Sequence, residues 1–241
     1  MKHAVVIGSG PAGLMAAEVM AKAGIKVTIC EAKPSVGRKF LMAGKSGLNL
    51  TKEEESKAFH VAFTEATRWL APMLDAFGPD AVQTWARDLE QELFTGTTGR
   101  VFPKAMKASP LLRAWLVRLG DLDVTINTCW RWTGWEGAAL AFDTPDGIQS
   151  IASDVTVLAL GGASWQRLGS DGAWYPMLLE KGLRLTPFAP ANAGLSVAWS
   201  PYMEKHLGTA IKSISLTSGP YTSRGEAILS RHGIEGGGIY S

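Results

Sequence analysis

The stretch that decides the fold reads AVVI at residues 4–7, GSGPAG at 8–13 and VTICE at 27–31. The apolar run at 4–7 is typical of a buried strand, and residues 14–23 after the glycine turn have the composition of a helix. A second buried strand then ends on the acid Glu31. A strand, a glycine turn, a helix and a strand that ends in an acid together indicate a dinucleotide site, with the pyrophosphate at the helix start.

Each residue of the turn has a physical role in this hypothesis. Gly8 permits the tight turn out of the strand, Gly10 lets the backbone approach a pyrophosphate, and Gly13 lets the helix pack against the sheet. The free N–H groups and the dipole of the helix start favour negative charge. Glu31 would accept hydrogen bonds from the hydroxyls of an adenosine ribose and would repel a 2′-phosphate. A glycine-rich surface turn is the alternative, and the flanking strands and helix disfavour it.

Composition excludes several classes of protein. The 241 residues, 46% of them hydrophobic, suffice for one large domain or two small ones. The 24 basic and 22 acidic residues give a net charge of +2, which disfavours a nucleic-acid surface. No apolar run is as long as the roughly 18 residues of a membrane span, and the first residues run into the predicted strand rather than a signal peptide. We therefore expect a cytoplasmic protein whose partner is a small-molecule substrate, with no nucleic acid and no membrane.

The cysteines and tryptophans are interpreted mainly as packing residues. Cys30 and Cys129 have no metal-binding spacing and the histidines are scattered, so we expect no metal site. Cys30 lies within a buried strand pattern and is predicted to be a core residue. Trp130 and Trp132 share parity and would lie on one face of a strand with Trp135 nearby. Packing is the favoured interpretation of these tryptophans, and stacking on a flavin or a substrate is the alternative.

The rest of the chain alternates between helical and strand patterns. Residues 34–52 read as a long loop, and helical patterns follow from residue 53, after Pro79 and over 111–119, where Ser109 would cap the helix. The remaining predictions are a hairpin around 95–102, a third parallel strand at 123–126, a β-meander at 130–153, a buried strand at 155–160 and a short helix at 172–180. These elements predict an α/β fold with a Rossmann-like parallel sheet, helices and a β-meander. We assign this domain to residues 1–187, with a helical segment at about 53–119, and the start of a second, β-rich substrate or cap domain to residues 188–241.

Five segments together resemble the bacterial flavoproteins called aminoacetone-oxidase-like or BaiN-like, within the superfamily that has two dinucleotide-binding domains. The segments are 8–13 with Glu31, 37–51, 99–103, 160–165 with 169–172, and 225–226 with 232–233. The resemblance implies a Rossmann-like FAD-binding domain with FAD as the cofactor. Because the chain shows no second GxGxxG between a strand and a helix, NAD(P)H would visit only as a transient electron donor.

The chain departs from this family in two places. Many members carry Gly-Arg-Cys-Asn in the long loop where this chain has SGLN at residues 46–49, so a role for that arginine or cysteine does not carry over. The altered loop leads us to expect a different substrate. Family members are also considerably longer, and their late segment returns to the flavin. We therefore expect a C-terminally truncated chain that binds FAD less tightly.

The resemblance also implies which residues contact FAD and which take part in the reaction. Arg38 would neutralise phosphate charge or border the flavin ring. Lys45 would stabilise a reduced anionic flavin, Arg100 would bind an anionic substrate, and Asn49 is a third weak catalytic candidate, whereas solvated loop and turn residues are the alternative. The predicted FAD contacts are Gly8, Gly10, Pro11, Ala12, Gly13, Glu31, Ala32, Gly37, Arg38, Lys39, Gly44, Asn49, Gly161 and Gly162.

Three functions are compatible with these observations. The first is an FAD-dependent oxidoreductase that transfers hydride between a small organic substrate and flavin, and the loop at 37–51 favours it. The second is a single-domain NAD-binding dehydrogenase. The third is a non-catalytic remnant or a flavoprotein acting on RNA, and the balanced charge disfavours RNA.

Overall fold

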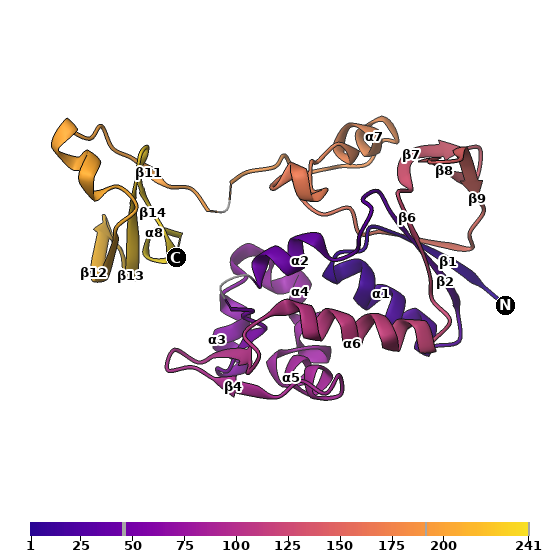
Figure 1. The fold of residues 1–241 in the computed structure, drawn as a ribbon, viewed down its shortest axis with the longest axis horizontal. Helices are drawn as coiled ribbons and strands as arrows, with labels where there is room; N and C mark the ends of the chain where they lie inside the picture. The colour runs from indigo at the N-terminus through magenta and orange to yellow at the C-terminus, as the bar shows by residue number, and fades with distance from the viewer. Residues whose placement is uncertain (45–46, 191, 241) are drawn as a thin grey trace. The chain divides into compact units, whose positions relative to one another are not determined.

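The computed structural model describes residues 1–44, 47–190 and 192–240. The chain divides into two compact units, Met1–Leu185 and Thr186–Ser241, whose elements are drawn in Figure 1. In the described part of the chain, no helix has the length and apolar character needed to cross a bilayer.

A parallel sheet forms the centre of the larger unit. Its strand order is β10-β1-β2-β6, and every neighbouring pair is parallel. The helix α1 (Pro11–Lys22) connects β1 to β2. This arrangement confirms the predicted α/β, Rossmann-like fold. The strand bounds are β1 (His3–Ile7), β2 (Lys26–Glu31), β6 (Thr125–Thr128) and β10 (Val155–Leu158).

The two faces of the sheet pack against different layers, because successive side chains of a strand point to opposite faces. Ala4 and Val6 of β1 belong to a core that also contains α1 and the helix α6 (Ala108–Asp121). Val5 and Ile7 belong to a second core with the β-meander and α7 (Trp174–Glu180). Figure 1 shows α6 alongside α1. The meander strands are β7 (Arg131–Glu136), β8 (Ala139–Thr144) and β9 (Gly147–Ile151), and they confirm the predicted meander.

A helical segment with a small antiparallel sheet lies between β2 and α6 in the chain. Its sheet has the order β3-β5-β4 and contains the hairpin predicted around 95–102. The helices are α2 (Arg38–Ala43), α3 (Ser56–Val61), α4 (Thr67–Ala76) and α5 (Pro79–Arg87), with the short 3-10 helix η1 (Thr64–Ala66). The strands are β3 (Thr51–Lys52), β4 (Leu93–Thr95) and β5 (Arg100–Pro103).

Three predictions about local structure were wrong. The segment 34–52 is not a continuous loop, because α2 begins at Arg38 after Gly37 caps it in a left-handed conformation. Ser109 is not the cap of α6. The N-cap is Lys107 and the helix begins at Ala108, so Ser109 lies within its first turn. The strand β10 is not buried. Val155 and Leu158 are 41% and 36% exposed, because among the described strands β10 pairs with β1 alone and so lies at the sheet edge.

The smaller unit contains an antiparallel sheet with the order β11-β14-β13-β12. Between Ile211 and Ile214 the register of β12 and β13 shifts, and Ser213 has a φ of 56°. The bounds are β11 (Leu195–Ser196), η3 (Pro201–His206), β12 (Ala210–Ser218), β13 (Tyr221–Ser230), β14 (Gly233–Glu235) and α8 (Gly237–Tyr240).

The glycine turn packs so tightly that side chains are excluded at two of its positions. Gly8 has a φ of 103°, and a Cβ there would lie 2.3 Å from the carbonyl oxygen of Ala159. A Cβ on Gly13 would lie 1.9 Å from the carbonyl oxygen of Gly8. A Cβ on Gly10 would meet no atom within 4 Å. The first helix therefore begins in direct contact with the turn, and open space lies beside Gly10.

A buried carboxylate joins α1 to α5 and α6. Glu18 of α1 is 1% exposed, and its Oε2 accepts hydrogen bonds from Nε1 of Trp115 at 2.7 Å and of Trp85 at 3.1 Å. Its Oε1 accepts from Lys22 at 2.6 Å and from Arg118 at 3.1 Å. Burial alone would raise the pKa of Glu18, but the hydrogen bonds from Lys22, Trp85 and Arg118 outweigh it and lower the pKa below the ordinary carboxyl value.

We predict that Glu18→Ala lowers the free energy of unfolding by about 3–5 kcal/mol, because the buried donors around it lose their acceptor. Urea unfolding followed by tryptophan fluorescence measures this change. Lys22→Ala is the matched control, since the Lys22 side chain is 53% exposed, and it should change the free energy by at most about 1 kcal/mol. Equal losses of stability in the two variants would contradict the role of Glu18 as the acceptor that joins α1 to α5 and α6.

The same carboxylate predicts a pH dependence. A lowered pKa means that the charged form of Glu18 stabilises the fold above the ordinary value of 4.5, and that this stabilisation is lost as the pH falls through the lowered pKa. The stability difference between wild type and Glu18→Gln should therefore be constant above pH 4.5 and shrink at lower pH.

The turn geometry predicts that Gly13→Ala lowers the free energy of unfolding by about 1–3 kcal/mol, because the new methyl group overlaps backbone. Gly10→Ala should change it by at most about 1 kcal/mol, since its φ of −72° suits any L residue and the space beside it is open. Thermal or urea unfolding of both variants provides the test. A Gly13→Ala variant as stable as wild type would contradict this packing.

Candidate functional site

A cleft of about 600 Å³ lies where β1, β2 and β10 end, and Ile7, Glu31 and Leu158 line it. In open α/β sheets ligands bind outside the carboxyl ends of the strands. Many of the residues predicted from the sequence to contact FAD line this cleft. They are Gly8, Gly10, Pro11, Ala12, Glu31, Ala32, Gly37, Arg38, Lys39 and Gly161.

Other predicted residues do not line the cleft. Gly13 packs against Gly8, and a Cβ on Gly44 would lie 2.5 Å from the Cβ of Ala108, so both are packing positions. Asn49 is exposed, and Gly162 does not line the cleft although its neighbour Gly161 does. Of the weak catalytic candidates, Arg100 lies exposed on β5 and neither it nor Asn49 lines the cleft. Lys45 falls outside the described residues.

The start of α1 gives the cleft a positive end. Gly10 is the N-cap, no side chain caps the helix, and Pro11 at the first position has no N–H. The first backbone N–H groups of a helix have no partner within the helix, and the helix dipole adds partial positive charge at the same place. Gly10, Pro11 and Ala12 all line the cleft, so this end of α1 is open to an anionic ligand.

Glu31 is held in place by the backbone around it. Its Oε2 accepts hydrogen bonds from the backbone N–H and the hydroxyl of Ser9, and its Oε1 accepts one from the N–H of Lys33 at 2.8 Å. A carboxylate has about four acceptor positions, so Glu31 retains capacity to accept a hydrogen bond from a ligand. The role of Ser9 in orienting the acid was missed in the sequence, where it is only the variable residue of the turn.

Arg38 presents an unsatisfied donor beside the helix start. Gly37 donates its backbone N–H to the carbonyl of Ser9 at 3.1 Å, which places α2 next to the glycine turn. Arg38 Nη1 donates to Ser35 Oγ at 3.1 Å, but its Nε is buried and has no hydrogen-bond partner among the described residues. A buried unpaired donor is costly, so this atom points to a ligand acceptor.

Lys39 connects α2 to the segment after β10. Its Nζ donates to Ser164 Oγ at 3.0 Å and lies 3.4 Å from Ser170 Oγ. Ser170 in turn donates to the carbonyl of Gly162 at 3.0 Å. Ser170, which also lines the cleft, was not among the predicted site residues, although it lies in a segment that carried the family resemblance.

The opposite wall of the cleft is apolar and comes from the meander and α7. Trp130 and Trp132 line it together with Met177, Leu178 and Leu185. Trp132 also packs in the core, as predicted. Its ring contacts that of Trp135 edge-on, with 4.8 Å between the ring centroids. The spacing of two residues between Trp130 and Trp132 predicted that they share one face of a strand. From the sequence, packing was the favoured role for both.

Among the described residues, the cleft has no activated cysteine thiol and no metal cluster. Cys30 lines the cleft, but it is fully buried, and burial raises the pKa of its thiol to about 12 in spite of a hydrogen bond with Asn127. The thiol therefore stays protonated near neutral pH and is a weak nucleophile. Among the described residues no group of three or more histidine, cysteine or acidic side chains could hold a metal ion.

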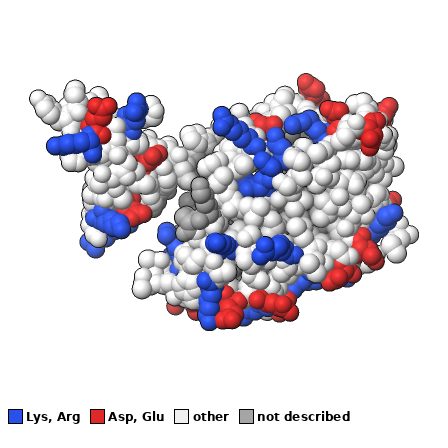
Figure 2. All heavy atoms as spheres, viewed as in Figure 1, with Lys and Arg blue, Asp and Glu red and all other residues white. Residues whose placement is uncertain are grey.

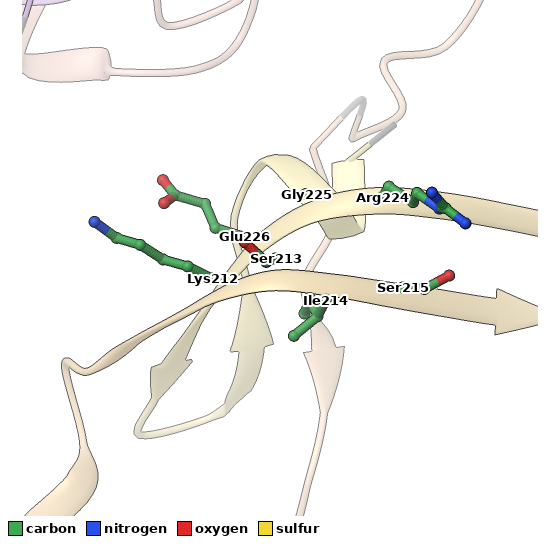
Figure 3. A pocket seen from close by; sticks show the side chains of 7 residues that line it. All are labelled: Lys212, Ser213, Ile214, Ser215, Arg224, Gly225 and Glu226. Carbon is green, nitrogen blue, oxygen red and sulfur yellow. The ribbon is translucent and has the colours of Figure 1, made fainter.

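A second hollow lies on the smaller unit, and its charged side chains do not point toward a common centre. It lies between β12 and β13 at the register shift (Figure 3). Lys212 and Glu226 extend at one end of it, whereas Arg224 and Ser215 lie toward the other end. On the face of the larger unit drawn in Figure 2, basic and acidic side chains are interspersed. The cleft beside α1 is therefore the candidate functional site.

Comparison with known proteins agrees with this geometry. A 3-dehydro-bile acid delta(4,6)-reductase of Clostridium scindens is 30% identical over 206 residues, which make up 84% of this chain and 49% of that protein. The solved structure of the open conformation of a flavocytochrome c3 fumarate reductase has a TM-score of 0.61 and 16% identity over 88% of this chain and 47% of that one. The chain thus spans about half the length of both relatives.

The family match covers almost every residue. Residues 2–239 match the family described as the HI0933-like protein Rossmann domain. The matched range includes the glycine turn, the cleft and the smaller unit. This chain belongs to the HI0933-like Rossmann family.

Proposed function

We propose that the cleft binds FAD and that the chain is the cofactor-binding part of an FAD-dependent oxidoreductase. The observation that carries the proposal is the buried, unpartnered Nε of Arg38, which lies in the same cleft as the open start of α1. Two sources of positive charge in one cleft suit a pyrophosphate. The bile acid reductase relative supports a redox reaction on an organic substrate.

The residues of the cleft fit the separate parts of FAD. The N–H groups at the start of α1 and Arg38 would hold the pyrophosphate, and Glu31 would accept hydrogen bonds from the adenosine ribose. Gly10 leaves room for the phosphate oxygens because no atom lies within 4 Å of its missing Cβ. Lys39 of α2 and Ser170, which follows β10, would border the flavin part of the molecule.

Bound flavin supplies the redox chemistry, which is hydride transfer to or from a small organic substrate. The protein supplies binding, orientation and charge. We further propose that NAD(P)H is the transient electron donor, and that the chain is related to the aminoacetone-oxidase-like and BaiN-like flavoproteins, which the reductase relative supports. The smaller unit would contribute to the substrate side, as predicted for residues 188–241.

A visible spectrum tests the proposed function directly. The purified chain, incubated with FAD and freed of excess, should show the absorption bands of bound oxidised flavin. Anaerobic addition of NADH or NADPH should bleach these bands. A protein that stays colourless with FAD but is protected from unfolding by NAD would instead support a single-domain NAD-binding dehydrogenase.

Arg38→Met should weaken FAD binding by about 10- to 100-fold, because a charged hydrogen-bond donor to the pyrophosphate is lost. Quenching of flavin fluorescence on titration measures the dissociation constant. Arg113→Met is the matched control, since Arg113 is exposed on α6 and does not line the cleft. A dissociation constant for Arg38→Met within twofold of wild type would show that Arg38 does not contact the cofactor.

A further inference from the structure

A second buried donor in the cleft is also without a partner. Trp132 lines the cleft and is 8% exposed, and its indole Nε1 has no hydrogen-bond partner among the described residues. In the described part of the chain, the buried side-chain nitrogen and oxygen atoms without a partner are this atom and the Nε of Arg38. The residues that carry these two atoms both line the same cleft. Since native proteins satisfy nearly all buried polar groups, this coincidence indicates a ligand with acceptors at two places.

The indole of Trp132 is held in one orientation. The register of β7 and β8 shifts between Trp132 and Gly134, which has a φ of 126°. A bulge of this kind re-aims side chains. Residues 132 and 135 would lie on opposite faces of a regular strand, yet their rings contact edge-on at 4.8 Å and both pack in the same core. The indole N–H is therefore a fixed donor rather than a rotating one.

The place of Trp132 in the cleft relates it to one part of the proposed ligand. Trp130 donates its backbone N–H to the carbonyl of Glu31 at 2.8 Å, so the start of the meander adjoins the acid that would hold the ribose. A base is attached directly to its ribose and must lie beside it. The wall there is apolar, with Trp130, Met177 and Leu178, and accommodates a flat ring.

We infer that Trp132 selects the adenine base, with its indole N–H donating a hydrogen bond to a ring nitrogen of adenine. This inference rests on the proposed binding of FAD in the cleft. Adenine carries unprotonated ring nitrogens at N1, N3 and N7, which are acceptors, whereas a flavin mononucleotide has no base at this place. Trp132 would thus bind the nucleotide half of the cofactor, and Arg38 the pyrophosphate.

The test uses Trp132→Phe in the full chain, which keeps an aromatic ring and removes the N–H. Dissociation constants are measured by calorimetry for FAD, ADP and FMN. Trp132→Phe should weaken FAD and ADP by about tenfold and leave FMN unchanged. Trp69→Phe, which removes an indole N–H at a position 67% exposed on α4 and outside the cleft lining, should leave all three unchanged.

Two results would overturn the inference while sparing the proposed function. The first is tight FAD binding by Trp132→Phe with a dissociation constant within twofold of wild type. The second is an equal loss of FAD and FMN, which would indicate a distorted cleft rather than a lost contact with the base. If wild type binds neither FAD nor ADP, the proposed function fails as well, so the two failures are distinguishable.

A ligand series on the wild-type chain gives an answer that does not depend on how the variant folds. ADP is compared with 1-deaza-, 3-deaza- and 7-deaza-ADP, in each of which carbon replaces one acceptor nitrogen. Wild type should bind one of the three analogues about tenfold more weakly than ADP. The Trp132→Phe variant should bind that analogue and ADP with equal dissociation constants, because it lacks the N–H that the nitrogen would accept from. Equal binding of ADP and all three analogues to wild type would exclude a hydrogen bond between Trp132 and the base.

Discussion

The close contact between Gly13 and the carbonyl of Gly8 is the constraint from which the site follows. With 1.9 Å between that oxygen and any Cβ at position 13, the helix can begin here only if the residue is glycine. The helix then starts immediately after the strand, at the edge where the sheet ends. Its unpaired N–H groups lie at this edge, beside the acid that ends β2. A looser turn would move the start of α1 away from the cleft and from Glu31.

Successive side chains of β1 point to opposite faces of the sheet, and each face packs in a separate hydrophobic core of the larger unit. Ala4 and Val6 pack against α1 and α6, and the buried Glu18 of α1 is bound to α6 by hydrogen bonds from Trp115 and Arg118. Val5 and Ile7 pack against the meander and α7. The first core packs around the helix whose start lines the cleft, and the second contains Trp132 and Leu178 of its apolar lining. Both cores therefore support side chains of the cleft, and a binding site needs such packed support.

The chemistry of the cleft is asymmetric. Its unsatisfied groups are donors: the helix start, Arg38 Nε and Trp132 Nε1. Glu31, the carboxylate at the end of β2, is an acceptor that Ser9 and Lys33 orient. A ligand that matches this pattern carries anionic or neutral acceptors along its length and hydroxyl donors at one place. FAD has this distribution, and a thiol nucleophile is absent because Cys30 remains protonated.

The sequence by itself determined the Rossmann-like βαβ unit, the hairpin, the meander and the part of the cleft lining that surrounds the glycine turn and Glu31. It could do so because strand and helix periods, turn glycines and the acid that ends β2 are local in the chain. Only the tertiary structure decided which partners meet. Nothing in the local sequence marks Glu18 as buried, because α5 and α6 cover it only in the folded chain, and β10 was predicted to be buried although it lies at a sheet edge. For Trp132 the sequence offered stacking on a ligand as an alternative to packing, and the structure added a buried N–H without a partner among the described residues. Whether a buried atom has a partner depends on long-range contacts that no local pattern records.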